Sequence, residues 1–130
     1  MWIDKEKNSS YNFKAPSIGA DEGKKVEVMF PTVEKVSPTL SSNAATVEVN
    51  RDTTIVDLGT LSAAATLTLT PTDNLGTGAK VVVKSTSDGT ARNVTVKQDT
   101  DTTVGTIAGT ASTTVVKMIV WDGSAWILVG

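Results

Sequence analysis

Short runs of alternating apolar and polar residues fill the chain from about residue 45 onward. The clearest is Ala65–Thr70, in which Ala65, Leu67 and Leu69 share one side and three threonines share the other. An alternation with period two is typical of a β-strand with one buried face. No segment shows a convincing helical period. The runs predicted as strands are Ala45–Val49, Thr53–Leu58, Ala65–Thr70, Lys80–Lys84, Asn93–Gln98, Thr103–Ile107, Thr113–Trp121 and Ala125–Val129.

These runs follow one another at intervals of roughly ten residues and are separated by Gly, Asn, Asp and Ser, which is typical of an all-β sandwich or barrel. The connections look short and local, and no fixed-length repeat predicts a solenoid. We therefore expect a compact antiparallel β-sandwich or barrel, jelly-roll-like in topology. Tight turns are predicted at Pro71–Asn74, Leu75–Gly78, Ser87–Thr90 and Asp122–Gly123.

The closing segment predicts a hairpin whose strands are apolar on both faces. Val115, Ile119 and Trp121 fall on one side of the pleat, while Val116, Met118 and Val120 fall on the other. The run Val81–Val83 is also apolar on both sides. A strand in so small a domain buries both faces only between two layers or against another subunit. The residues assigned to a subunit interface or to the core are Val82, Val116, Met118, Val120, Trp121, Trp126 and Leu128.

The first 42 residues differ in composition from the rest. They are rich in charge and in proline, and only Val26–Phe30 alternates clearly enough to pair as a strand. We therefore expect an extended N-terminal arm over residues 1–42 and a β-sandwich domain over residues 43–130. Aromatic residues in a polar segment without its own core commonly anchor in a partner. The predicted anchors are Trp2, Tyr11 and Phe13.

Composition excludes several functions. The 12 basic and 14 acidic residues are interleaved and leave a net charge of −2, so there is no basic stripe for nucleic acid. The chain has no Cys and no His, which removes thiol nucleophiles, the usual zinc ligands and the commonest general base. No apolar window is long enough to span a bilayer, and the first residues do not resemble a signal peptide. We expect no enzyme activity, no cofactor and no membrane insertion.

Three weak candidates for chemistry remain. Asp99–Gly105 partly matches a calcium loop but lacks a third ligand and a closing Glu, which favours a solvated turn. Asp57 lies within a predicted strand, unlike Asp52, Asp73, Asp88 and Asp122, and there it could join an acid–base pair. Trp121 and Trp126 could form a sugar platform, although two Trp that flank a tight turn more often lock a hairpin to a core.

The ending Val120–Gly130, with its Trp-Asp-Gly-Ser-Ala-Trp hairpin, resembles the closing element of small bacteriophage fibre and capsid-decoration proteins. The resemblance covers mainly residues 45–130. It implies a virion accessory protein such as a head fibre or decoration protein, usually a homotrimer. Its arm would attach to the major capsid protein or to another virion protein, and its β-domain would face outward. The protein would be made in the host bacterial cytoplasm and reside in the virion. The chain is too short for the shaft of a long tail fibre.

Two rival functions stay open at this point. A tail-associated adhesin or carbohydrate-binding module would bind a host-surface glycan through exposed Trp and the loops around Asp73–Asn74 and Asp88–Gly89. A small glycosidase would need a pair of carboxylates that face each other across a cleft.

Overall fold

The computed structural model describes residues 33–130, and within this range the chain forms β-strands and no helix. Each of the eight runs predicted as strands from residue 45 onward is confirmed, with boundaries that agree to within a few residues. The strands are β3 (Val33–Val36), β4 (Ala44–Val49), β5 (Thr53–Leu61), β6 (Ala65–Pro71), β7 (Lys80–Ser87), β8 (Val94–Gln98), β9 (Thr102–Ile107), β10 (Thr114–Trp121) and β11 (Trp126–Val129).

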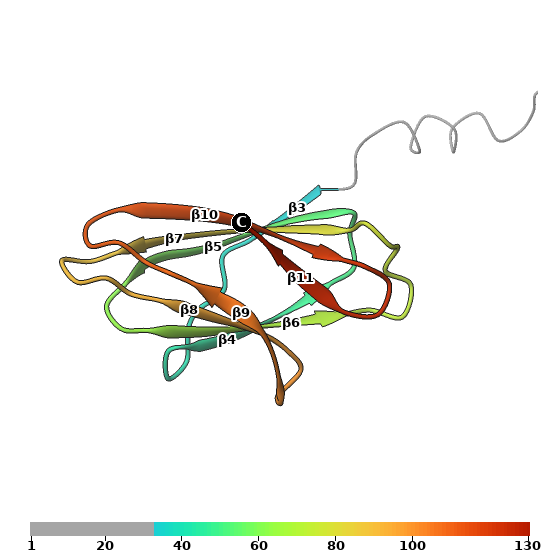
Figure 1. The fold of residues 1–130 in the computed structure, drawn as a ribbon, viewed down its shortest axis with the longest axis horizontal. Coiled ribbons are helices and arrows are strands. Elements are labelled where there is room, and N and C mark those ends of the chain that lie inside the picture. The colour runs from blue at the N-terminus through green and yellow to red at the C-terminus, as the bar shows by residue number, and fades with distance from the viewer. Residues whose placement is uncertain (1–32) are drawn as a thin grey trace, which may run out of the picture. The chain divides into compact units, whose positions relative to one another are not determined.

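The strands are arranged in two stacked sheets (Figure 1). The first sheet has the order β11-β10-β7-β5-β3, and the second has the order β4-β6-β8-β9. Each sheet has two free ends, so the expected sandwich is confirmed and the alternative of a closed barrel is wrong. The two sheets bring β9 and β11 to the same flank, where these two edge strands lie beside each other (Figure 1).

The expected antiparallel arrangement is wrong, because successive strands from β3 to β8 alternate between the two sheets. Each of these strands therefore pairs in parallel with the next strand but one: β3 with β5, β5 with β7, β4 with β6 and β6 with β8. The chain winds as a flattened coil of three turns, two strands to a turn, in the manner of a short β-solenoid. Antiparallel pairing is confined to β7 with β10, β8 with β9 and β10 with β11.

The turns of this coil differ in length, which is why the sequence shows no fixed repeat. Val33 pairs with Thr53 and Thr53 pairs with Lys80, so consecutive turns of the first sheet advance by 20 and then 27 residues. A repeat search detects a constant period, and these unequal connections remove it. The chain therefore follows a coiled path although its sequence has no repeat of fixed length.

The sandwich begins earlier in the chain than residue 43. Val33–Val36, which the composition assigns to the arm, forms β3 and pairs in parallel with β5 from Val33↔Thr53 to Val36↔Val56. This short edge strand lies between Pro31 and Pro38, and the two prolines hide its alternation. The residues predicted as an alternating strand at 26–30 and as anchors at Trp2, Tyr11 and Phe13 lie outside the described range.

The core lies between the two sheets and consists of the inward residues of each alternating strand. On β6, Ala65, Leu67 and Leu69 are buried, whereas the threonines between them are not, as the alternation predicts. Ile119, Trp121 and Trp126 also pack inward, and each is less than a tenth exposed. Inward residues of the second sheet that complete the core are Val47, Val49, Val94, Val96 and Ile107.

Candidate functional site

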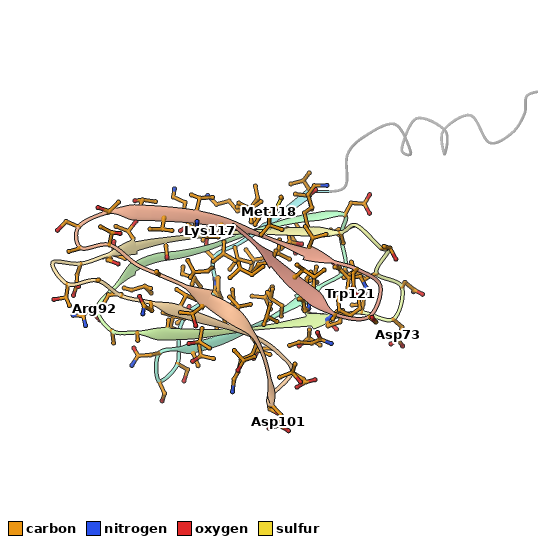
Figure 2. All side chains as sticks on the ribbon, in the orientation of Figure 1. Asp73, Arg92, Asp101, Lys117, Met118 and Trp121 are labelled. Carbon is orange, nitrogen blue, oxygen red and sulfur yellow. The ribbon has the colours of Figure 1, made fainter. Side chains whose placement is uncertain are left out.

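The strand β10 divides its apolar residues between two environments. Ile119 and Trp121 point into the core, whereas Val116 and Met118 lie on the opposite side of the pleat. Figure 2 shows Met118 on the outer side of the first sheet and Trp121 between the sheets. Val116 is 55% exposed, so this outer side of β10 faces solvent within the described chain. The sequence prediction of a strand apolar on both faces is confirmed.

The register continues this outer apolar side across four of the five strands of the first sheet. Met118 pairs with Val129 on β11 and with Val82 on β7, and Val82 pairs with Ile55 on β5. One uninterrupted apolar row therefore crosses four strands, and it ends on β3 at Lys35, the partner of Ile55.

Two further rows flank this central row. The row on one side begins on β11, where Ile127 pairs with Val120 of β10, and Val120 pairs with Lys80 of β7. It continues through Thr53 of β5, the partner of Lys80, to Val33 of β3. Ile127 and Val33 are each about half exposed. We call this surface the apolar face, and its apolar members are Val33, Ile55, Val82, Val116, Met118, Val120, Ile127 and Val129.

On the other side of the central row, charges of both signs lie next to Val116. Val116 pairs with Lys84, and Lys84 pairs with Asp57 on β5. The Lys84 ammonium lies 4.0 Å from the Asp57 carboxylate, and the side chains are 50% and 23% exposed. The amide of Gly59 also donates to Asp57, at 2.9 Å. The row therefore presents one positive and one negative group on neighbouring strands.

The outer side of the second sheet has the opposite character. Thr66, Thr68 and Thr70 point outward from β6, and Thr46 and Thr95 occupy matching positions on the neighbouring strands. Outward threonine hydroxyls suit a strand that faces water on one side. Because the same chain builds one wet face and one apolar face, the apolar face is not required for strand formation, and such patches mark interaction surfaces.

The structure separates the seven residues predicted for the interface or the core. Trp121 and Trp126 are core residues, and Leu128 is partly buried against the core at the β11 edge. The other four belong to the apolar face, and they are Val82, Val116, Met118 and Val120. Sequence reasoning missed Val33, Ile55, Ile127 and Val129, since only the strand register shows that they join the same surface.

The two Trp side chains lock the closing hairpin to the opposite sheet. They are direct partners across β10 and β11, with ring centroids 5.1 Å apart and planes inclined at 56°. The Trp126 indole N–H donates to the Leu69 carbonyl oxygen at 3.2 Å. Both rings are buried, so the idea that they form a sugar platform is wrong. The Asp122 carboxylate closes the turn by accepting from the amides of Ser124 and Ala125.

The aspartates considered for metal binding or catalysis have local partners. The Asp99 carboxylate accepts from the amides of Asp101 and Thr102, so it shapes the β8–β9 turn. Figure 2 shows Asp101 at the tip of that turn. Asp57 faces Lys84, as described above. Within residues 33–130, no three His, Cys, Asp or Glu side chains gather where they could hold a metal ion.

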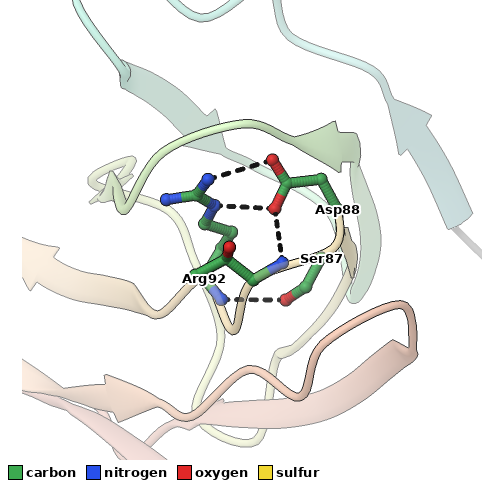
Figure 3. A network of polar contacts seen from close by, with 4 residues as sticks. Ser87, Asp88 and Arg92 are labelled. Atoms are coloured by element: carbon green, nitrogen blue, oxygen red, sulfur yellow. Dashed lines mark hydrogen bonds and ion pairs between the residues drawn. The ribbon is translucent and has the colours of Figure 1, made fainter.

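A polar network ties the β7–β8 loop together (Figure 3). The Arg92 guanidinium donates to both oxygens of Asp88, at 2.8 and 3.0 Å, and the Arg92 amide donates to the Ser87 hydroxyl at 3.0 Å. The Arg92 guanidinium, helped by the amide of Thr90, lowers the pKa of Asp88 below its ordinary value. The network therefore uses the charged groups of Asp88 and Arg92 to hold the loop itself.

A hollow of about 360 Å³ opens between the sheets on the flank of β9 and β11. Ile107, Val115 and Leu128 give it an apolar lining. Lys117 also lines the hollow, and its ammonium donates to the carbonyl oxygen of Gly130, the last residue, at 3.2 Å. No Asp or Glu side chain lines this hollow, so it lacks the pair of acidic side chains that a glycosidase needs.

No protein-family model matches this chain, and no curated protein shows a significant match to it. Across residues 33–130 there is also no helix of the length and apolar character that a membrane span requires.

Proposed function

We propose that the chain is a structural component of a bacteriophage virion, either a head fibre or a capsid decoration protein. The N-terminal arm attaches it to the major capsid protein or to another virion protein, and the β-sandwich is displayed outward. The subunits associate as a homotrimer. The protein is made in the host bacterial cytoplasm, and it acts by assembly and not by catalysis.

The apolar face is the observation that carries this proposal. Within residues 33–130 an apolar row crosses the outer side of four strands, and a homo-oligomer would cover it. The closing Trp121–Trp126 hairpin, which resembles that of small phage fibre and decoration proteins, supports the same assignment. A chain without thiols, with its loops held by side chains such as Arg92, suits long service outside a cell.

The rival carbohydrate-binding function has less support. Its two loops, around Asp73–Asn74 and Asp88–Gly89, precede and follow β7 and so lie at opposite ends of that strand. In Figure 2, Asp73 and Arg92, the partner of Asp88, mark these opposite ends. With both Trp of the hairpin buried, the loops and rings do not combine into one glycan site.

The test is attachment to virions. Antibodies raised against the β-sandwich are applied to purified particles of the bacteriophage whose genome encodes the chain, and their position is recorded by electron microscopy. We expect label on the head. Particles without the chain, or a genome that encodes no virion, would overturn the proposal.

The role of the arm is tested separately with two variants added to particles that lack the chain. One lacks residues 1–20, and the other replaces Trp2, Tyr11 and Phe13 by Ala. We expect both to keep the oligomeric mass of the full chain and to lose attachment. Attachment by both variants would show that the arm is not the anchor, and loss of folding in the deletion would place the arm in the core.

A further inference from the structure

The rows of the apolar face differ in what they offer to another molecule. The central row, from Val129 to Ile55, is apolar over four strands. On β7, Lys80 lies two residues before Val82 and Lys84 lies two residues after it, so a lysine flanks the apolar row on each side. The only acidic group in these rows is Asp57, beside Lys84. A molecule that binds this face must cover the apolar row and match the charges on both sides of it.

A second copy of the chain can meet the face in two simple ways. A symmetry axis that runs across the strands, through the Val82 row, would place Lys80 of one copy over Lys84 of the other. Like charges brought together in an interface are strongly unfavourable. An axis parallel to the strands keeps every residue at its own height, so each row meets the same row of the next copy.

The second arrangement avoids this conflict. When a two-fold axis lies between β5 and β7, Lys84 of one copy faces Asp57 of the other, which is a complementary contact. Val82 then faces Ile55, and because β10 lies over β3, Val120 faces Val33 and Met118 lies over the alkyl chain of Lys35. A three-fold axis in the same direction would also keep each row at its own height.

The size of the overlap fits a weak interface. With the axis between β5 and β7, the strands β10, β7, β5 and β3 overlap, and β11 lies beyond them. Four strands spaced about 4.8 Å apart, with about seven residues along each, give a surface on the order of 450 Å², so two copies bury on the order of 900 Å² in total. An interface of this size is reversible, and the charged row must contribute to it.

We infer that the apolar face is the surface through which copies of this chain associate, about an axis parallel to the strands, with Lys84 of one copy paired to Asp57 of the next. The inference rests on the self-association contained in the proposed function, and it adds the surface, the direction of the axis and the pairing. The ion pair within each chain, at 4.0 Å, then becomes part of a ring of alternating charges between chains.

The pairing is tested by two charge reversals, Lys84→Glu and Asp57→Lys, measured by light scattering after size-exclusion chromatography. Each variant alone sets like charges against each other across the interface, and we expect its association to weaken at least tenfold. In an equimolar mixture the opposite charges meet again, so we expect mixed oligomers in native mass spectrometry. Two variants that associate as well as the original chain, or a mixture that forms no mixed oligomers, would overturn the pairing.

The surface is tested by Met118→Lys, with Thr68→Lys as the matched control on the outer side of the second sheet. We expect the Met118 variant to become monomeric and the Thr68 variant to keep the original mass, both with unchanged circular dichroism. An unaltered chain that is already monomeric, or a Met118 variant that keeps its mass, would overturn the inference. An oligomer found only off the virion would instead overturn the proposed function and leave the inference standing.

Discussion

The indole N–H of Trp126 donates a hydrogen bond to the carbonyl oxygen of Leu69, so the last strand of the chain is tied to the opposite sheet. The two residues are 57 positions apart in the sequence, and Trp126 is 5% exposed. The hairpin is therefore part of the core and not an appendage. Its partner Trp121 packs against it from β10.

Replacing this ring should separate the contributions of packing and hydrogen bonding. Trp126→Ala removes both, and we expect the free energy of unfolding to fall by about 3–5 kcal/mol. Trp126→Phe keeps most of the apolar volume and loses the donor, which should cost about 1–2 kcal/mol. Denaturant midpoints of the two variants measure the difference, and equal midpoints for both variants and the original chain would place Trp126 outside the core.

Thr54 offers a stabilising substitution. Its side chain is fully buried on β5, and its hydroxyl has no hydrogen-bond partner among residues 33–130. An unpaired buried hydroxyl is unfavourable, so Thr54→Val should raise the free energy of unfolding by about 1 kcal/mol. Thr53→Val is the control, because Thr53 lies on the outer side of the same strand, where its side chain is only partly buried. A lower melting temperature for Thr54→Val would indicate that the hydroxyl has a partner in solution.

Replacement of Gly109 or Gly105 by Ala should lower the free energy of unfolding by different amounts. A Cβ on Gly109 would overlap the backbone carbonyl of Arg92 and lie 2.7 Å from the Ser87 hydroxyl, which is held by the loop network. A Cβ on Gly105 would meet only the end of the flexible Leu128 side chain, at 2.9 Å. We expect Gly109→Ala to cost about 1–3 kcal/mol and Gly105→Ala less than about 1 kcal/mol. Thermal unfolding of the pair checks this order, and a reversed order would contradict the loop geometry.

The Asp88–Arg92 pair predicts a sensitivity to acid. Because the pKa of Asp88 is lowered in the folded chain, its contribution to stability is complete above the ordinary value near 3.8 and is lost as the pH falls through the folded-state pKa. The melting temperature of Asp88→Asn should therefore be lower than that of the original chain, and the difference should be largest above pH 4. The gap should narrow towards pH 2, and a gap that is constant with pH would rule out this linkage.

Asp122 provides an independent case of the same effect. The amides of Ser124 and Ala125 lower its pKa, so Asp122→Asn should also flatten the acid branch of the melting curve. The two sites are on different loops, and the double variant should show the sum of the two changes. A double variant as acid-sensitive as the original chain would mean that other carboxylates govern acid unfolding.

The strands could be predicted from the sequence, and their pairing could not. Alternation along Ala65–Pro71 is a local signal that survives in any sandwich. Whether β5 pairs with its neighbour β6 or with β7 depends on the path of the short connection 62–64, which crosses between the sheets. That connection contains no Asn-Gly or Gly-Gly pair. The lack of such a pair is the one signal in the sequence against a tight hairpin between β5 and β6.

The candidate surface was partly predictable for the same reason. Val116, Met118 and Val120 are apolar positions within one strand, so a single strand reveals them. Ile55 and Val33 join them only through the parallel register of β5 with β7 and β3. The pairing of Lys84 with Asp57 likewise depends on two strands that are far apart in sequence.

The flank where Gly105 on β9 faces Leu128 on β11 has a consequence for growth of the assembly. An unprotected edge strand invites foreign chains to extend the sheet without limit, which leads to fibrous aggregates. Here β9 and β11 lie beside each other, and the Leu128 side chain close to Gly105 hinders an incoming strand at this point. Extension of the sheets by strand addition is therefore disfavoured on this flank.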